Sequence, residues 1–117
     1  MSNERFFQLT PGNERFTVWH LMPEFTRDVY TTAENRLSRF TLVATVEAPC
    51  YQAVFDYTNH IDSNWTEGEH VVELFTPKAR TRSTSVGDVV SDENGTFYRV
   101  EPMGWRVIEM SNSDGAN

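Results

Sequence analysis

Three basic residues, Lys78, Arg80 and Arg82, stand at alternate positions of the run PKARTRSTSVGDVV, in a chain that is otherwise acidic. Side chains at alternate positions of an extended chain point to the same side, so these cations would line up. Aligned cations can bind phosphate groups or an acidic groove of a protein, and we predict that they form part of a partner-binding surface. In the alternative, structural interpretation they balance nearby carboxylates or keep an edge strand from pairing. Those carboxylates are Glu67, Glu69 and Glu73.

The polar loop HIDSNWTEGEH, residues 60–70, carries further candidate contact residues, namely His60, Asp62 and Trp65. Trp65 has two interpretations: it packs beneath the loop, or it is exposed and anchors a partner, because Trp is enriched at binding hot spots. The loop also holds residue types that bind divalent metals. These are His60, Asp62, Glu67, Glu69 and His70. Their spacing matches neither HExxH nor the EF-hand order, so we predict no metal site.

A catalytic nucleophile is not indicated. Cys50, the only cysteine, would need a base and a site that favours the thiolate. The candidate bases are His20, His60 and His70. Cys50 falls on the apolar stripe of a predicted helix with Val54 and Tyr57, where a small buried side chain suffices. Because Ser83 and Ser85 match no nucleophile elbow and no Gly-rich phosphate loop occurs, we predict a protein that is not an enzyme and has no cofactor.

Composition favours one acidic domain that meets other proteins. The chain has 117 residues and a formal net charge of −7, with 17 acidic against 10 basic residues. This balance weighs against general nucleic-acid binding, which depends on neutralising phosphates, and fits basic protein surfaces. Biased coding or a salty cytoplasm would also produce surplus carboxylates. The N-terminal run lacks the apolar segment of a secretory signal and no membrane span is apparent, so we expect a cytoplasmic protein.

Hydrophobic periodicity predicts two strands and then a helix in the first half. Residues 16–21 alternate, with Phe16, Val18 and His20 on one face. In the clearest strand, 37–48, four apolar side chains at alternate positions share one face, and Val43 is assigned to the other face. The four residues are Phe40, Leu42, Ala44 and Val46. From Pro49 the spacing becomes helical, until Asn59 and His60 end the helix. The helical stripe is Cys50, Ala53, Val54, Tyr57 and Ile61.

The second half predicts four strands, at 70–75, 85–91, 96–101 and 105–110. Asn94-Gly95 accepts positive φ, and a turn that short implies an antiparallel hairpin. The order β-β-α-β-β-β-β indicates an α+β domain over residues 1–110, with one helix on a curved antiparallel sheet or small open barrel and a C-terminal β-meander. Residues 1–14 are expected to form a loose arm and residues 111–117 a disordered tail. Edge strands leave room for a homodimer.

Residues 56–107 resemble known small proteins. The runs TNHIDSNW, RSTSVGDVV, TFYRV and GWRVI resemble a pattern of accessory proteins of phages, plasmids and viruses, and the second half resembles the YodL-like domain. The resemblance implies a role in a mobile element, and a host cytoplasm if the element is viral, without a biochemical activity to carry over. Folding alone can also explain the motif: Gly87 would admit a bulge, and Asp88 would bind local backbone amides.

We therefore expect a noncatalytic accessory protein of a virus, phage or plasmid that binds a host or element-encoded protein and no membrane. The alternative is a small nucleic-acid-binding module that uses the basic run and exposed aromatic rings. These rings are Phe97, Tyr98 and Trp105. The basic run is expected to be exposed, so that replacing its three cations by alanine costs about 1 kcal/mol or less. The core is expected to be supported by Val86, Val89 and Trp105.

Overall fold

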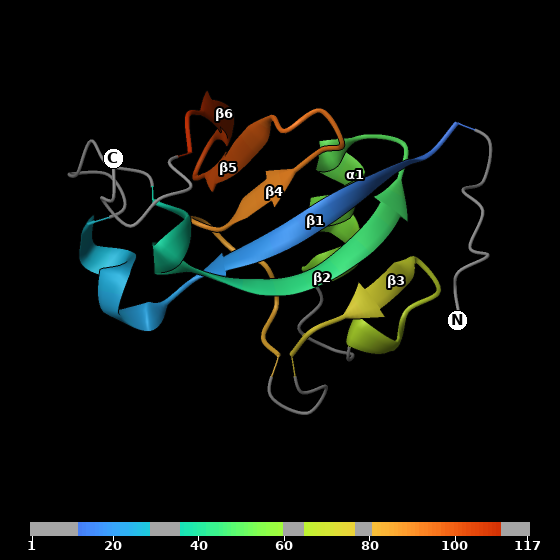
Figure 1. Ribbon diagram of the computed structural model, residues 1–117, viewed down its shortest axis with the longest axis horizontal. Helices are drawn as coiled ribbons and strands as arrows, with labels where there is room; N and C mark the ends of the chain where they lie inside the picture. Colours follow the sequence, from blue (N-terminus) through green and yellow to red (C-terminus); the bar gives the residue numbers. More distant parts are fainter. Residues whose placement is uncertain (1–11, 29–35, 60–64, 77–80, 111–117) are drawn as a thin grey trace.

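The computed structural model describes residues 12–28, 36–59, 65–76 and 81–110. They form a small α+β domain with a six-stranded antiparallel sheet, in the order β3-β2-β1-β4-β5-β6, and one α-helix (Figure 1). The predicted order of strands and helix is confirmed. The sheet is open within the described residues, with β3 and β6 at its two edges. Most of the predicted N-terminal arm and the whole predicted tail lie outside the described residues.

The central pair of the sheet is β1 (Glu14–Leu21) and β2 (Phe40–Ala48). Two 3-10 helices, η1 (Pro23–Asp28) and η2 (Leu37–Arg39), lie between them in the sequence. Thus residues 37–39, predicted to be the start of the second strand, are helical.

A β-bulge in β2 overturns the predicted alternation. Val18 pairs with Ala44 and Trp19 pairs with Leu42, which leaves Val43 as an extra residue without a partner in β1. An extra residue shifts the following side chains to the other face of a strand. Val43 is therefore buried at 1% exposure, whereas Leu42 is 36% exposed. Phe40 packs in the cluster on the opposite face from Ala44 and Val46, so the predicted faces of Phe40, Leu42 and Val43 were wrong.

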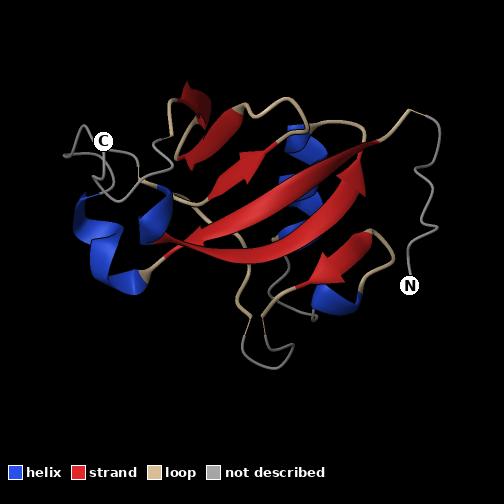
Figure 2. Ribbon diagram, in the orientation of Figure 1, coloured by secondary structure: helices blue, strands red, loops and turns tan. Residues whose placement is uncertain are grey.

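The single α-helix, α1 (Tyr51–Thr58), packs against one face of the sheet (Figure 2). Its buried residues are Val54 and Thr58, and the Thr58 hydroxyl donates to the Val54 carbonyl oxygen at 2.9 Å. Cys50 takes the N-cap position and is exposed, so its predicted burial was wrong. A short 3-10 helix η3 (Trp65–Glu67) then leads to β3 (Val71–Leu74).

The last three strands are β4 (Val89–Ser91), β5 (Phe97–Glu101) and β6 (Gly104–Ile108), each paired antiparallel with the next. The predicted hairpin between β4 and β5 is confirmed. Its turn is held by Asp92, whose Oδ1 accepts from the backbone N–H groups of Asn94 and Thr96 at 2.9 Å each. The strand predicted to begin at residue 85 begins only at Val89.

Apolar side chains gather on both faces of the sheet. The cluster under α1 joins the helix to the inner side chains of β1 and β2, and Trp105 packs against it as predicted. Its buried members are Phe16, Val18, Val43, Ala44, Val46, Ala48, Val54, Trp65 and Val90. The opposite face packs against Phe25 of η1. That second cluster is centred on Leu21, Phe40, Val89 and Ile108. Both faces are therefore covered at β4, where Val89 and Val90 are both completely buried.

The bulge gives a direct test, because it reverses the environments of two neighbouring residues. Val43→Asp places a charge in the apolar cluster and should destabilise the fold by several kcal/mol, enough to unfold most of the protein. Leu42→Asp, at the half-exposed neighbouring position, should cost about 1 kcal/mol or less. Urea unfolding followed by circular dichroism would measure both. If Leu42→Asp were the more damaging change, the strand would follow simple alternation and the bulge would be wrong.

Candidate binding site at the end of strand β1

The backbone of Leu21, at the end of β1, lies beyond the last residue that pairs with β4. The pairing of β1 with β4 ends where Trp19 meets Val89, and hydrogen-bonding groups on one side of a strand recur at every second residue. Leu21 is therefore the next residue that needs partners on that side. Two side chains supply them: Oδ1 of Asp88 accepts from the Leu21 N–H at 2.8 Å, and Nη2 of Arg82 donates to the Leu21 carbonyl oxygen at 3.1 Å.

Arg82 and Asp88 hold each other in a two-pronged ion pair. Nη1 and Nη2 of Arg82 donate to the two carboxylate oxygens of Asp88 at 2.6 and 2.8 Å. Asp88 is almost completely buried, whereas the Arg82 side chain is 44% exposed. The carboxylate draws its remaining support from backbone N–H groups. A buried charge is tolerated only when it is paired and fully hydrogen-bonded, and Asp88 meets that condition.

A tight turn brings the two partners together. The Asp88 N–H donates to the Ser85 carbonyl oxygen at 3.0 Å, and the Ser85 N–H donates back to Oδ2 of Asp88 at 2.8 Å. Gly87 has a φ of 97°, which a type II turn requires at its third position and which suits glycine. The predicted local hydrogen bond of Asp88 is thus confirmed. For Gly87 the sequence offered a bulge or a close backbone neighbour; Gly87 lies in a turn, and its N–H donates to the Val100 carbonyl oxygen at 2.9 Å. Val86 is 46% exposed on this turn, so the prediction that it supports the core was wrong.

His20 lies beside this ion pair and is itself buried. Its Nε2 is 3.0 Å from the Thr84 hydroxyl and 3.9 Å from Oδ2 of Asp88, and its ring meets the Trp65 ring at an angle of 60°. Burial lowers the pKa of His20 to about 4, and the Arg82 cation adds to this, although the Asp88 carboxylate opposes it. The imidazole is therefore uncharged at neutral pH and acts as a neutral hydrogen-bonding group.

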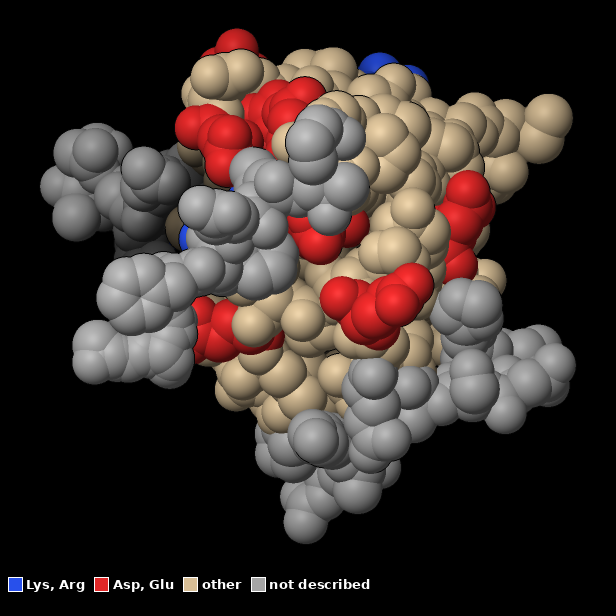
Figure 3. Space-filling view, turned by 90° about the vertical axis from the view of Figure 1, so that its right-hand side faces the viewer, with Lys and Arg blue, Asp and Glu red and all other residues tan. Residues whose placement is uncertain are grey.

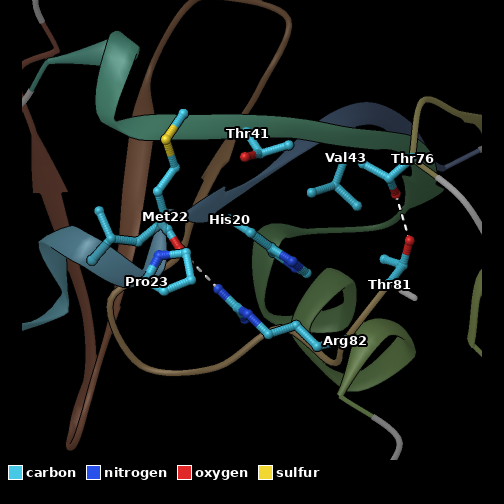
Figure 4. Close-up of a pocket in the computed structure, with 9 residues that line it drawn as sticks. His20, Met22, Pro23, Thr41, Val43, Thr76, Thr81 and Arg82 are labelled. Carbon is cyan, nitrogen blue, oxygen red and sulfur yellow. Dashed lines mark hydrogen bonds between the residues drawn. The ribbon is translucent and has the colours of Figure 1, made fainter.

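A pocket of about 330 Å³ opens next to His20 (Figure 4). Its walls come from the end of β1 and the two residues after it, from β2, and from residues on either side of the 77–80 segment. The nine described lining residues are His20, Leu21, Met22, Pro23, Thr41, Val43, Thr76, Thr81 and Arg82. The hydroxyl groups of Thr76 and Thr81 hydrogen-bond to each other at 2.5 Å, which ties two of the walls together.

The structure brings two of the predicted contact residues together and leaves the others open. Trp65 is buried, so its packing interpretation holds, and its Nε1 donates to the Arg82 carbonyl oxygen at 2.9 Å. Arg82 is exposed as predicted, but its guanidinium is engaged within the protein. The remaining predicted contact residues lie outside the described residues. They are Lys78, Arg80, His60 and Asp62.

Sequence reasoning missed His20 and Thr84 as parts of one site. A signal for His20 was present, because alternation placed the imidazole on the same face of a strand as the apolar residues Phe16 and Val18. Thr84 gave no comparable signal. It is completely buried, and its backbone accepts from the Asn59 side chain and donates to the Thr58 carbonyl oxygen. These contacts depend on how the 81–88 segment returns to α1, which no local pattern encodes.

Comparison with protein-family models, curated proteins and solved structures found no match to this chain. Within the described residues, no three side chains of the His, Cys, Asp and Glu types gather closely enough to hold a metal ion. The described helices all fall short of the length and apolar character needed to cross a membrane.

The first test removes the guanidinium. Arg82→Ala leaves the Asp88 carboxylate buried without its partner and the Leu21 carbonyl oxygen without its donor. We expect a loss of about 2 to 4 kcal/mol, reduced from the fully buried case because Arg82 is partly exposed. Because of the ion pair with Asp88, this expected loss is larger than the loss of about 1 kcal/mol or less that the sequence predicted for all three cations. Arg106→Ala removes a more exposed guanidinium paired with Glu101 and should cost under about 1 kcal/mol. Equal losses in urea unfolding would show that the ion pair has no special structural role.

The second test uses pH. The pKa of His20 is about 4 in the folded protein and near its ordinary value of 6.5 in the unfolded chain. Between these values the unfolded chain binds a proton that the folded protein does not, so stability is complete above pH 6.5 and falls as the pH drops towards 4. The loss from this residue should reach about 3 kcal/mol. His20→Gln keeps a neutral polar side chain and should lose less stability over the same range. Identical pH profiles would contradict the assignment.

Proposed function

We propose that this protein is a noncatalytic accessory protein of a virus, phage or plasmid that binds a host or element-encoded protein through its acidic surface. The resemblance of residues 56–107 to small proteins of mobile elements supplies the biological setting. The observation that carries the proposal is the difference between the two kinds of charge. Arg82, Arg99 and Arg106 form ion pairs with carboxylates of the same molecule, whereas many other carboxylates face solvent.

The exposed charge of the described residues is mainly negative. Exposed carboxylates occur at the start of β1, on α1, around β3 and in the turn after β4, and Figure 3 shows acidic side chains across the face at the right of Figure 1. Among them are Glu14, Asp56, Glu69, Glu73 and Glu93. By contrast, Arg99 and Arg106 both bind Glu101, and Arg82 binds Asp88. Such a surface complements a basic protein patch and would speed encounter with it.

The geometry around His20 argues against nucleophilic catalysis. The imidazole is 3.0 Å from the Thr84 hydroxyl, which resembles a base beside a nucleophile. Thr84, however, is completely buried, so its oxygen cannot reach a substrate carbonyl or phosphate. The arrangement suits a neutral hydrogen bond that fixes the 81–88 segment against β1.

The aromatic rings that could stack on nucleic-acid bases already stack on each other. Tyr98 lies parallel to Tyr51, with ring centroids 4.2 Å apart, and Trp105 meets Tyr51 edge-on at 5.0 Å. Phe97 packs against Trp19. Base stacking needs free ring faces and a cationic groove that follows the backbone. The described surface offers little of either, so protein binding is the better-supported function.

The test combines affinity capture with matched neutral variants. A tagged protein, cross-linked in cells that carry the mobile element, should recover one specific protein partner in a complex that resists nuclease. Neutralising two exposed carboxylates, Glu14→Gln with Glu73→Gln, should weaken that complex about fivefold or more at low salt. The control makes the same change of charge elsewhere, with Glu24→Gln and Glu109→Gln, and should bind as the unmodified protein does.

Two outcomes would contradict the proposal. One is the absence of any specific protein above background together with a nuclease-sensitive nucleic acid in the eluate, which would favour the alternative function. The other is a protein complex that is unaffected by salt and by both pairs of substitutions, because binding would then not depend on the acidic surface.

A further inference from the structure

The pocket beside His20 has features of a ligand site that the proposed protein binding does not use. Its volume of about 330 Å³ lies at the small end of the range for small-molecule sites, which suits a ligand with one ring. Val43, Met22 and Pro23 give it apolar walls, and Thr41 stands at an exposed position on β2. Figure 4 shows the His20 ring between Thr41 and Val43 on one side and Arg82 on the other.

His20 offers one polar group to the pocket. Its Nε2 is the ring nitrogen that faces the Thr84 hydroxyl. For the other ring nitrogen, Nδ1, the described residues supply no hydrogen bond, and Nδ1 is not one of the fully buried atoms that lack a partner. Nδ1 is therefore accessible from the pocket, and a ligand with a hydrogen-bonding group can bind it in place of solvent.

The charges of the described lining residues are balanced. Arg82 is the only charged residue among the nine described lining residues, and its guanidinium is neutralised by Asp88 behind the wall. The imidazole is uncharged at neutral pH. An ionised ligand would therefore lose its hydration without gaining an unpaired counter-charge, whereas a neutral ligand would not pay that penalty.

We propose that this pocket binds a small uncharged molecule with an apolar ring and one hydrogen-bonding group, which contacts the His20 imidazole. The apolar ring packs on Val43, Met22 and Pro23, and the polar group meets the free ring nitrogen. The site is separate from the acidic surface, so it stands whether or not the protein binds a partner there.

The experiment titrates the unmodified protein with three probes of the same size and different charge: benzyl alcohol, benzoate and benzylammonium. Amide and imidazole NMR signals report the position of binding. We expect benzyl alcohol to give saturable shifts at His20, Val43, Thr41 and Arg82, with a dissociation constant in the millimolar range. The two ions should bind at least about tenfold more weakly, because each is desolvated without a partner.

A matched pair of variants tests the location. Thr41→Trp projects a large ring into the pocket from an exposed position and should abolish the benzyl alcohol shifts. Leu42→Trp places the same ring on the opposite side of the same strand and should leave them unchanged. His20→Phe keeps the shape of the pocket, removes the free ring nitrogen, and should weaken benzyl alcohol more than toluene.

Several results would overturn the proposal. These are no saturable shift with benzyl alcohol up to its solubility limit, equal or tighter binding of either ion, or shifts that persist in Thr41→Trp. The titrations of the unmodified protein need no variant, so they decide the matter even if Thr41→Trp fails to fold.

Discussion

The unpaired backbone edge of Leu21 is the constraint on which the rest of the structure depends. Since β4 stops opposite Trp19, the N–H and carbonyl of Leu21 must find partners or remain unsatisfied in the interior. The ion pair of Arg82 and Asp88 supplies both, acting as a side-chain continuation of β4. Fixing these two residues also fixes the 81–88 segment, and with it the Thr84 hydroxyl beside His20. The ion pair of Arg82 and Asp88 therefore fixes the end of β1, the contact of Thr84 with His20, and the pocket wall at Arg82.

The ion pair of Arg82 and Asp88 also affects the charge that the surface presents. A guanidinium that neutralises a buried carboxylate contributes little net field outside, so Arg82 does not make this region basic. Arg99 and Arg106 are likewise paired with Glu101, so the exposed charge of the described residues is mainly negative. The described residues that line the neighbouring pocket carry no net charge for the same reason. The mainly negative exterior of the described residues and the balanced charge of these lining residues are thus two consequences of one pattern of internal pairing.

The bulge at Val43 connects the pocket beside Arg82 with the apolar core. By turning Val43 inward, it fills the cluster under α1 and lines the pocket, while Leu42 moves towards solvent. The two faces of the sheet are both covered at β4, where Val90 belongs to the cluster under α1 and Val89 to the opposite cluster.

The sequence by itself determined the order of elements, the hairpin at Asn94-Gly95, the inner face of β1 and the local role of Asp88, because each depends on residues close together in the chain. It assigned Leu42 and Val43 to the wrong faces, since a bulge is set by the partner strand and leaves no mark in a simple alternation. Only the tertiary structure decided that Arg82 binds the backbone of Leu21, because this acceptor lies 61 residues away in the sequence. A run of alternating cations looks the same whether it meets a partner or a distant carbonyl. The physical difference is which backbone groups the folded sheet leaves unpaired, and that is a property of the whole sheet.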